Sequence, residues 1–382
     1  MFLRLASRLL CLAGLLFSFS AGRATLQVFH PESGRPAIRD FRPTDYRGHP
    51  QVYGIAQGHD RIIYISTAEG ILGFDGARWT NYPMPSAQVY ELVVTSDGRI
   101  WAGGNDELGY FQPAPEGGLA YHSLRAQLPA GAAPWGRTTK VARIGDAVFF
   151  LGPRGVLRVD SNHRVNFWPT PSGLRPTLHT IGGQAILHLT GRGLFRLGDD
   201  TLEPFADPAP IRNGNRAVST TLADGRVLFC GTGAGAFLLD PATGGVEHLP
   251  GVLDEIVRTT RVMNALTLPD GTAVIATSGQ GLVLLSADRR TTRRLDRESG
   301  LADNAVLSLA RDHEGGLWLG YNSGVARLAL ESNVSVFDAT NGPTPGTIDI
   351  WGRHEGQLYV GTYDGLYRME PADAEGRGGR FV

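Results

Sequence analysis

Lysine is almost missing from this chain of 382 residues: Lys140 is the only one, and every other basic residue is an arginine or a histidine. Charged residues make up only 19% of the chain, and the formal net charge is -1. Nucleic-acid binding requires a basic face that contacts phosphates. The composition therefore argues against a nucleic-acid partner, and Schiff-base chemistry would have a single candidate residue.

Cysteine is scarce too, with Cys11 and Cys230 as its two copies. Cys11 lies in a segment typical of a secretory signal, in which Arg4 and Arg8 flank the start of an apolar core and small residues precede a cut after Ala24. Removal of residues 1–24 leaves Cys230 alone, so no intramolecular disulfide is expected. No later run is apolar for about twenty residues, which predicts no membrane span after cleavage. We expect an exported protein, in the periplasm of a Gram-negative cell.

The motifs of several enzyme classes are missing as well. The chain has no Gly-x-Ser-x-Gly elbow, and its histidines form neither a His-x-x-x-His pair nor a His-Glu-x-x-His motif. The Gly-rich run Gly231–Gly235 joins two predicted strands rather than a strand and a helix, so it is interpreted as a turn. We therefore predict no catalytic residue, no cofactor and no metal site, and hence no enzyme.

Glycine is abundant, with 51 copies, and eight of them mark an internal repeat. Each marker precedes an apolar strand and follows a second strand and a polar or Gly turn. The markers are spaced 38 to 46 residues apart, at Gly70, Gly109, Gly155, Gly193, Gly235, Gly281, Gly324 and Gly365. A period of this size is typical of stacked or radially arranged repeats.

The repeat predicts an all-β fold. Variable segments between the repeats, such as Arg78–Tyr82, Arg164–Trp168 and Val334–Phe337, would supply a fourth, outer strand. Four-stranded antiparallel blades repeated around an axis form a β-propeller. Seven blades are favoured, with eight as the alternative if Phe41-Arg42 completes the last repeat. The predicted organisation is a signal peptide (1–24), an N-terminal extension (25–40), the propeller (41–370) and a C-terminal tail (371–382).

Residues shared by the repeats are interpreted as structural. Large side chains recur on the second strand and are predicted to pack one blade against the next; they are Tyr64, Trp101, Phe150, Trp318 and Tyr359. Residues that differ between repeats at the start of the innermost strand are candidates for ligand binding. This predicted site consists of Tyr53, Tyr90, Trp135, Arg137, His179, Arg216, Arg261, Asn304 and Trp351. Aromatic rings with arginine and asparagine suit a sugar or a carboxylated sugar.

Two stretches resemble the two-component regulator propeller family. One is Gly300–Val306 with Leu317–Gly320 and Gly324–Arg327, and the other is Tyr53–Gln57 followed by Gly70–Trp79. The resemblance implies an exported sensor domain of a bacterial hybrid two-component or diguanylate-cyclase-type signalling protein. We expect this chain to lack the C-terminal modules of such proteins. It also implies a carbohydrate-like ligand, an oligosaccharide or a uronic acid, and a membrane sensor kinase or cyclase as partner.

Three functions remain open at this point. The favoured one is ligand sensing, with the signal passed by contact to a partner. A protein-protein interaction propeller without a small ligand is the alternative, and a polysaccharide-active propeller enzyme is the third. A shortened sensor and a stand-alone exported binding protein would have the same sequence features.

Overall fold

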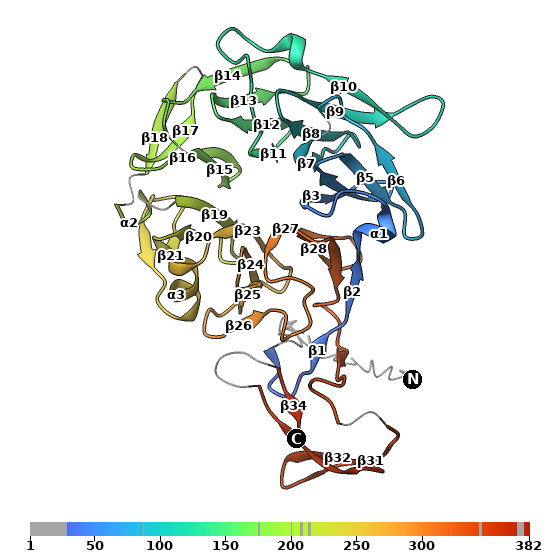
Figure 1. The fold of residues 1–382 in the computed structure, drawn as a ribbon. Helices are drawn as coiled ribbons and strands as arrows, with labels where there is room; N and C mark the ends of the chain where they lie inside the picture. Colours follow the sequence, from blue (N-terminus) through green and yellow to red (C-terminus); the bar gives the residue numbers. More distant parts are fainter. Residues whose placement is uncertain are drawn as a thin grey trace, which may run out of the picture.

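The computed structural model describes residues 29–86, 88–174, 176–199, 201–206, 209–212, 215–343, 346–372 and 378–382. The predicted signal segment 1–24 lies outside these residues. The regular secondary structure of the described part is almost entirely β-strand, and seven four-stranded antiparallel sheets surround a common axis (Figure 1). The predicted β-propeller is therefore confirmed, and its ring has seven blades.

The first strand of each blade lies nearest the axis and contacts the first strand of a neighbouring blade (Figure 1). Blades 1 to 3 consist of β3 (Val52–Gln57), β4 (Ile63–Thr67), β5 (Gly70–Phe74) and β6 (Trp79–Tyr82); β7 (Val89–Val94), β8 (Ile100–Gly104), β9 (Leu108–Pro113) and β10 (Leu119–Ser123); and β11 (Lys140–Ile144), β12 (Ala147–Gly152), β13 (Gly155–Val159) and β14 (Val165–Pro169).

Blades 4 to 6 have the same order. They consist of β15 (Pro176–Ile181), β16 (Gln184–Leu189), β17 (Gly193–Leu197) and β18 (Leu202–Ala206); β19 (Asn215–Thr221), β20 (Val227–Thr232), β21 (Gly235–Leu239) and β22 (Val246–His248); and β23 (Val262–Thr267), β24 (Ala273–Thr277), β25 (Leu282–Leu285) and β26 (Thr292–Leu295). Short helices α1 (Pro43–Tyr46), α2 (Ala209–Arg212) and α3 (Val252–Thr259), and the 3-10 turn η2 (Arg125–Gln127), lie in the connections.

Blade 7 is closed by the N-terminal part of the chain. It contains β27 (Val306–Arg311), β28 (Leu317–Tyr321) and β29 (Val325–Leu328), and its outer strand is β2 (Ile38–Phe41), which pairs with β29. The expectation that Val334–Phe337 forms the outer strand of this repeat is wrong. Its two-residue strand β30 (Ser335–Val336) pairs instead with β1 (Arg35–Pro36), because β2 already occupies the free edge of β29.

The marker glycine of blade 7 shows why this position requires glycine. Gly324 has a φ of 142°, a backbone conformation that residues with a Cβ rarely adopt. A Cβ built there would lie 2.5 Å from the carbonyl oxygen of Phe41 on the outer strand. The glycine therefore allows the third and fourth strands to approach at the point where the ring closes.

The eighth repeat forms a sheet outside the ring (Figure 1). It contains β31 (Ile348–His354), β32 (Gln357–Thr362), β33 (Gly365–Glu370) and β34 (Arg380–Phe381), so its strands have the order of a blade. The eight-bladed alternative is wrong, because the N-terminal strand closes the ring on the seventh repeat. In consequence the large side chains of the eighth repeat lack the cover that a blade receives from its neighbours: Trp351 is 76% and Tyr363 93% exposed.

Within the ring, large residues on the second strands pack blade against blade, as the sequence predicts, with one correction of register. The same expectation for Tyr359 is wrong, because this residue lies on β32, outside the ring. Trp101 packs against blade 3, where its ring centroid lies 6.2 Å from that of Phe150. The equivalent of Trp101 in blade 3 is Phe149 and not Phe150, because Phe149 packs against the next blade in the chain, blade 4, as Trp101 packs against blade 3. The pairing of Gly152 with Gly155 sets this register, and it places the equivalent residue one position earlier in the chain than the sequence alignment assumed.

Asp312 links the packing residue Trp318 to the turn between β27 and β28. Its Oδ1 accepts hydrogen bonds from the backbone N–H groups of Glu314 (3.0 Å) and Gly316 (2.6 Å). Its Oδ2 accepts hydrogen bonds from Trp318 Nε1 at 2.8 Å and Arg327 Nε at 2.6 Å. Asp312 is thus a structural residue that holds the turn and the packing tryptophan together.

Candidate functional site

Three of the predicted site residues meet at the end of the ring where the innermost strands begin, which we call the strand-start face. The guanidinium carbon of Arg137 lies 3.9 Å from the centroid of the Tyr90 ring. The rings of Tyr90 and Tyr53 meet edge to face, with centroids 5.3 Å apart. Blade 1, blade 2 and the connection that leads to blade 3 therefore contribute one side chain each to a continuous stack.

β-Bulges place the two tyrosines in this stack. The pairing register shifts between Val52 and Gly54 in blade 1 and between Val89 and Glu91 in blade 2, so each tyrosine is an extra residue in its strand. A bulge re-aims the side chain of the extra residue. Each hydroxyl then donates a 2.6 Å hydrogen bond to the side-chain oxygen of a glutamine two residues earlier in the chain. Burial and the neighbouring Tyr90 raise the pKa of Tyr53, and Arg137 opposes this effect.

The connection between β10 and β11 positions Arg137. Trp135 is only 1% exposed, and its Nε1 donates to Thr138 Oγ1 at 2.9 Å. Asp106 N donates to Gly136 O (2.9 Å), and Gly136 N donates to Asp106 Oδ1 (2.7 Å). Trp135 is therefore an anchor for this loop rather than a surface that a ligand could reach, and it holds the adjacent arginine in place.

Two further residues at this face, Glu91 and Lys140, were not predicted to bind a ligand. Glu91 Oε2 lies 3.2 Å from Lys140 Nζ, and their side chains are 17% and 37% exposed. Burial raises the pKa of Glu91, and Lys140 opposes that shift. The sequence signal that could have revealed them is register. In each of the other blades, one residue of the first strand occupies the same place in the pairing with the second strand. None of these residues is charged; they are Gly54, Thr177, Val218, Asn264 and Ser308.

His179 is buried between blades 4 and 5, with 4% of its surface exposed. Its Nδ1 lies 2.8 Å from Ser219 Oγ, and its Nε2 lies 2.8 Å from Thr177 Oγ1. Burial lowers the pKa of His179 to about 3, with smaller contributions from His188 and Lys140. Both ring nitrogens are used inside the protein, so His179 offers no group to a ligand.

The other predicted residues do not join the stack. Arg216 is exposed and has a φ of 48°, while Arg261 is exposed and its carbonyl accepts a hydrogen bond from Ser278 N at 2.9 Å. The side chain of Asn304 accepts a hydrogen bond from Arg297 N at 2.8 Å. Trp351 lies on β31, outside the ring. Blades 6 and 7 have the same bulge as blades 1 and 2, and the residues equivalent to the two tyrosines are Met263 and Leu307, not Arg261 and Asn304.

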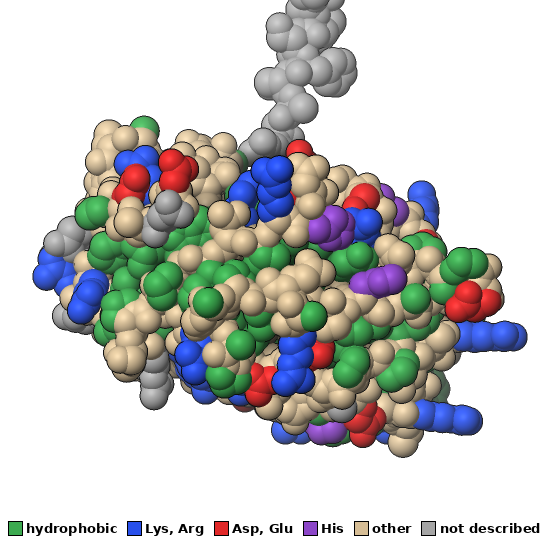
Figure 2. Space-filling view, turned by 90° about the horizontal axis from the view of Figure 1, so that it is seen from above, with side chains coloured by type: hydrophobic (Ala, Val, Ile, Leu, Met, Phe, Trp, Pro, Cys, Tyr) green, Lys and Arg blue, Asp and Glu red, His purple; other side chains and the backbone are tan. Residues whose placement is uncertain are grey.

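No group of three or more His, Cys, Asp or Glu side chains that could hold a metal ion occurs among the described residues. Within the same residues, no helix is long and apolar enough to cross a membrane. Figure 2 shows acidic and basic side chains interspersed over one side of the molecule, so that side presents no broad patch of a single charge.

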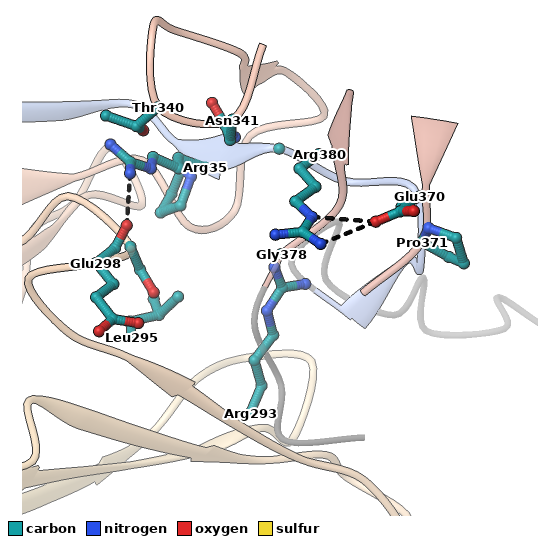
Figure 3. A pocket seen from close by; sticks show the side chains of 13 residues that line it. Arg35, Arg293, Leu295, Glu298, Thr340, Asn341, Glu370, Pro371, Gly378 and Arg380 are labelled. Atoms are coloured by element: carbon teal, nitrogen blue, oxygen red, sulfur yellow. Dashed lines mark hydrogen bonds and ion pairs between the residues drawn. The ribbon is translucent and has the colours of Figure 1, made fainter. Parts of the chain in front are cut away.

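A cavity of about 250 Å³ lies where the ring, β1 and the eighth-repeat sheet meet (Figure 3). Arg35 Nη1 lies 3.0 Å from Asp338 Oδ2, and Arg380 donates to Glu370 Oε2 from Nε (3.1 Å) and Nη2 (3.0 Å). Because these two guanidinium groups are paired with acids of the same chain, we interpret the cavity as part of the joint that attaches the eighth-repeat sheet to the ring.

Comparisons with known proteins agree with this architecture. A family model described as "Two component regulator propeller" matches residues 300–323, which belong to the seventh repeat. The comparison with curated proteins gave no match.

Solved structures with the same fold include the extracellular domains of two putative hybrid two-component systems of B. thetaiotaomicron. BT3049 has a TM-score of 0.65 and 17% identity over 91% of this chain and 49% of that one. BT4673 has a TM-score of 0.61 and 16% identity over 91% and 47%. A streptogramin B lyase has a TM-score of 0.60 and 16% identity over 77% of this chain and 97% of that one. The chain spans about half the length of the two extracellular domains.

Proposed function

From the premise that this chain carries a two component regulator propeller repeat within a seven-bladed ring, we propose that it is an exported ligand-sensing module of a bacterial signal-transduction system. The ligand is carbohydrate-like, an oligosaccharide or a uronic acid, and it binds at the strand-start face. The module has no catalytic activity of its own and resides in the periplasm. The similarity to extracellular domains of hybrid two-component systems supports this proposal.

One observation carries the assignment of the site: the guanidinium group of Arg137 stacks on Tyr90, and no described acidic side chain forms an ion pair with it. A stacked guanidinium keeps its in-plane N–H donors available, and these match the two oxygens of a carboxylate. The neighbouring rings of Tyr53 and Tyr90 add flat apolar surface. Together these groups suit a sugar that carries a carboxylate.

The signal would pass by contact through the eighth-repeat sheet to a membrane sensor kinase or cyclase. This sheet exposes Ile348, Ile350, Trp351, Tyr363 and Leu366, each more than half exposed. Ile350 and Leu366 share one face of the sheet, because both pair with Gly361, and exposed apolar side chains that lie together are typical of a surface that contacts another protein. Site and output surface would thus lie on different parts of the molecule, joined through β1 and the N-terminal segment.

A thermal-shift screen with uronic acids and oligosaccharides tests the ligand. We expect glucuronic or galacturonic acid to raise the melting temperature, and Arg137→Gln to abolish the rise. Arg61→Gln is the matched control, because Arg61 is also exposed and pairs with Glu314 at 3.4 Å at the opposite ends of the strands. If no sugar stabilises the wild-type protein, the carbohydrate assignment is wrong.

The eighth-repeat sheet also favours a second candidate, a protein-interaction propeller without a small ligand. This function predicts an unchanged melting temperature with every sugar, together with co-purification of a membrane protein that is lost in a Trp351→Ser/Leu366→Ser variant. The polysaccharide-active propeller enzyme of the sequence analysis is the third candidate, and the structure of a streptogramin B lyase shows that this fold also occurs in an enzyme. Turnover of uronate polymers that persists through extensive purification would favour that enzyme over our proposal.

A further inference from the structure

We propose that the Glu91–Lys140 pair makes the strand-start face selective for a zwitterionic sugar, one that carries both an amino group and a carboxylate. The ligand's carboxylate, which the proposed function places on Arg137, would also pair with Lys140, and its ammonium group would pair with Glu91, in place of the ion pair that the two residues form at 3.2 Å. This inference deepens the proposed function and rests on it for the location of the site.

The position of the pair supports a role beyond blade packing. Glu91 directly follows Tyr90, and Lys140 lies three residues after Arg137, so the pair adjoins both ends of the Tyr90–Arg137 stack along the chain. Both side chains are partly exposed, Lys140 more so than Glu91. The first strands of the other blades have no charged residue at the place in the pairing that Glu91 and Lys140 occupy. The residues that follow the pair, Leu92 in blade 2 and Val141 in blade 3, are both buried.

Selectivity follows from the cost of leaving a poorly solvated charge alone. A ligand with a carboxylate only would draw Lys140 away from Glu91 and leave that carboxylate unpaired. A ligand with an ammonium group only would leave Lys140 unpaired in the same way. A ligand that supplies both charges exchanges one ion pair for two, so neither protein group loses its partner.

Isothermal titration calorimetry with four probes tests this inference: muramic acid, which carries both charges, glucuronic acid, glucosamine, and the non-sugar zwitterion 4-aminobutyrate. We expect muramic acid to bind the wild-type protein about tenfold more tightly than either singly charged sugar. In a Glu91→Gln/Lys140→Met variant, which removes both charges at once, the advantage should fall to within about twofold. A Glu314→Gln/Arg61→Gln variant is the control and should retain the advantage.

The outcomes separate the two proposals. If glucuronic acid binds as tightly as muramic acid and responds to Arg137→Gln, the zwitterion inference is overturned while the sugar-binding function stands. If only 4-aminobutyrate binds, and the Glu91→Gln/Lys140→Met variant loses that binding, the pair selects zwitterions but the ligand is not a sugar. If none of the four probes binds, both proposals are overturned.

Discussion

The buried His179 should make the stability of the ring depend on pH, and substitution of this residue should reduce that dependence. Burial lowers its pKa to about 3 in the folded protein, compared with 6.5 for an unperturbed histidine. Protons therefore bind the unfolded chain more readily, and stability is lost as the pH falls below about 6.5. Between pH 7 and pH 5 the expected loss from this residue is about 2 kcal/mol, and the loss continues towards pH 3.

Guanidinium chloride unfolding at pH 7 and pH 5 measures this effect, in the wild-type protein and in His179→Gln. Glutamine can still hydrogen-bond to Ser219 and Thr177 but does not titrate. Between pH 7 and pH 5, we expect the free energy of unfolding to fall by about 2 kcal/mol more in the wild type than in the variant. This difference does not depend on how much the substitution itself changes the stability at pH 7. Equal losses in the two proteins would refute the reasoning. His188, whose pKa burial also lowers, remains in both and cancels in the comparison.

Asp312→Ala should lower the free energy of unfolding by about 3 kcal/mol, because it removes the buried carboxylate that accepts hydrogen bonds from Trp318 and Arg327. Chemical denaturation measures this loss, and a loss below about 1 kcal/mol would contradict the prediction. Phe41→Ala should lower the free energy of unfolding by about 3 to 5 kcal/mol, because the Phe41 side chain is buried on the strand that closes the propeller, with its centroid 5.6 Å from that of Trp318. A loss below about 1 kcal/mol in the same assay would show that closure of the propeller does not depend on this contact. Trp351→Ser should change the unfolding free energy of the ring by less than about 0.5 kcal/mol, because the side chain is 76% exposed; a larger loss would mean that the eighth-repeat sheet stabilises the ring.

The prediction of the candidate site was limited by register. Tyr53, Tyr90 and Arg137 lie together at one face, next to the start of the first strands where the repeat pattern predicts them, and their role in ligand binding stays a prediction. Trp135 was assigned to the same face, but it is buried, since the loop that carries it folds back on itself. An amphipathic tryptophan serves equally well as an anchor and as a ligand platform, and local sequence does not distinguish these roles.

The sequence also could not reveal Glu91 and Lys140 as a pair. They lie 49 residues apart, and only the packing of β7 against β11 brings their charged atoms together. Blade 2 has a bulge before Glu91, whereas the pairing in blade 3 is regular, so counting residues from the repeat markers does not align them. Similar reasoning explains the error at Phe150, where one residue of register decides which neighbouring blade a side chain meets.

By itself, the sequence determined the blade: the period of the marker glycines, the turns and the alternation of strands are local properties, and each is encoded within about forty residues. Only the tertiary structure decided how many blades close, because closure depends on whether β2, some 290 residues before its partner β29, occupies that strand's free edge. Since β2 pairs with the seventh repeat, the eighth is left outside the ring with its apolar side chains exposed. The number of blades and the surface open to partners thus follow from one long-range strand pairing that no single repeat encodes.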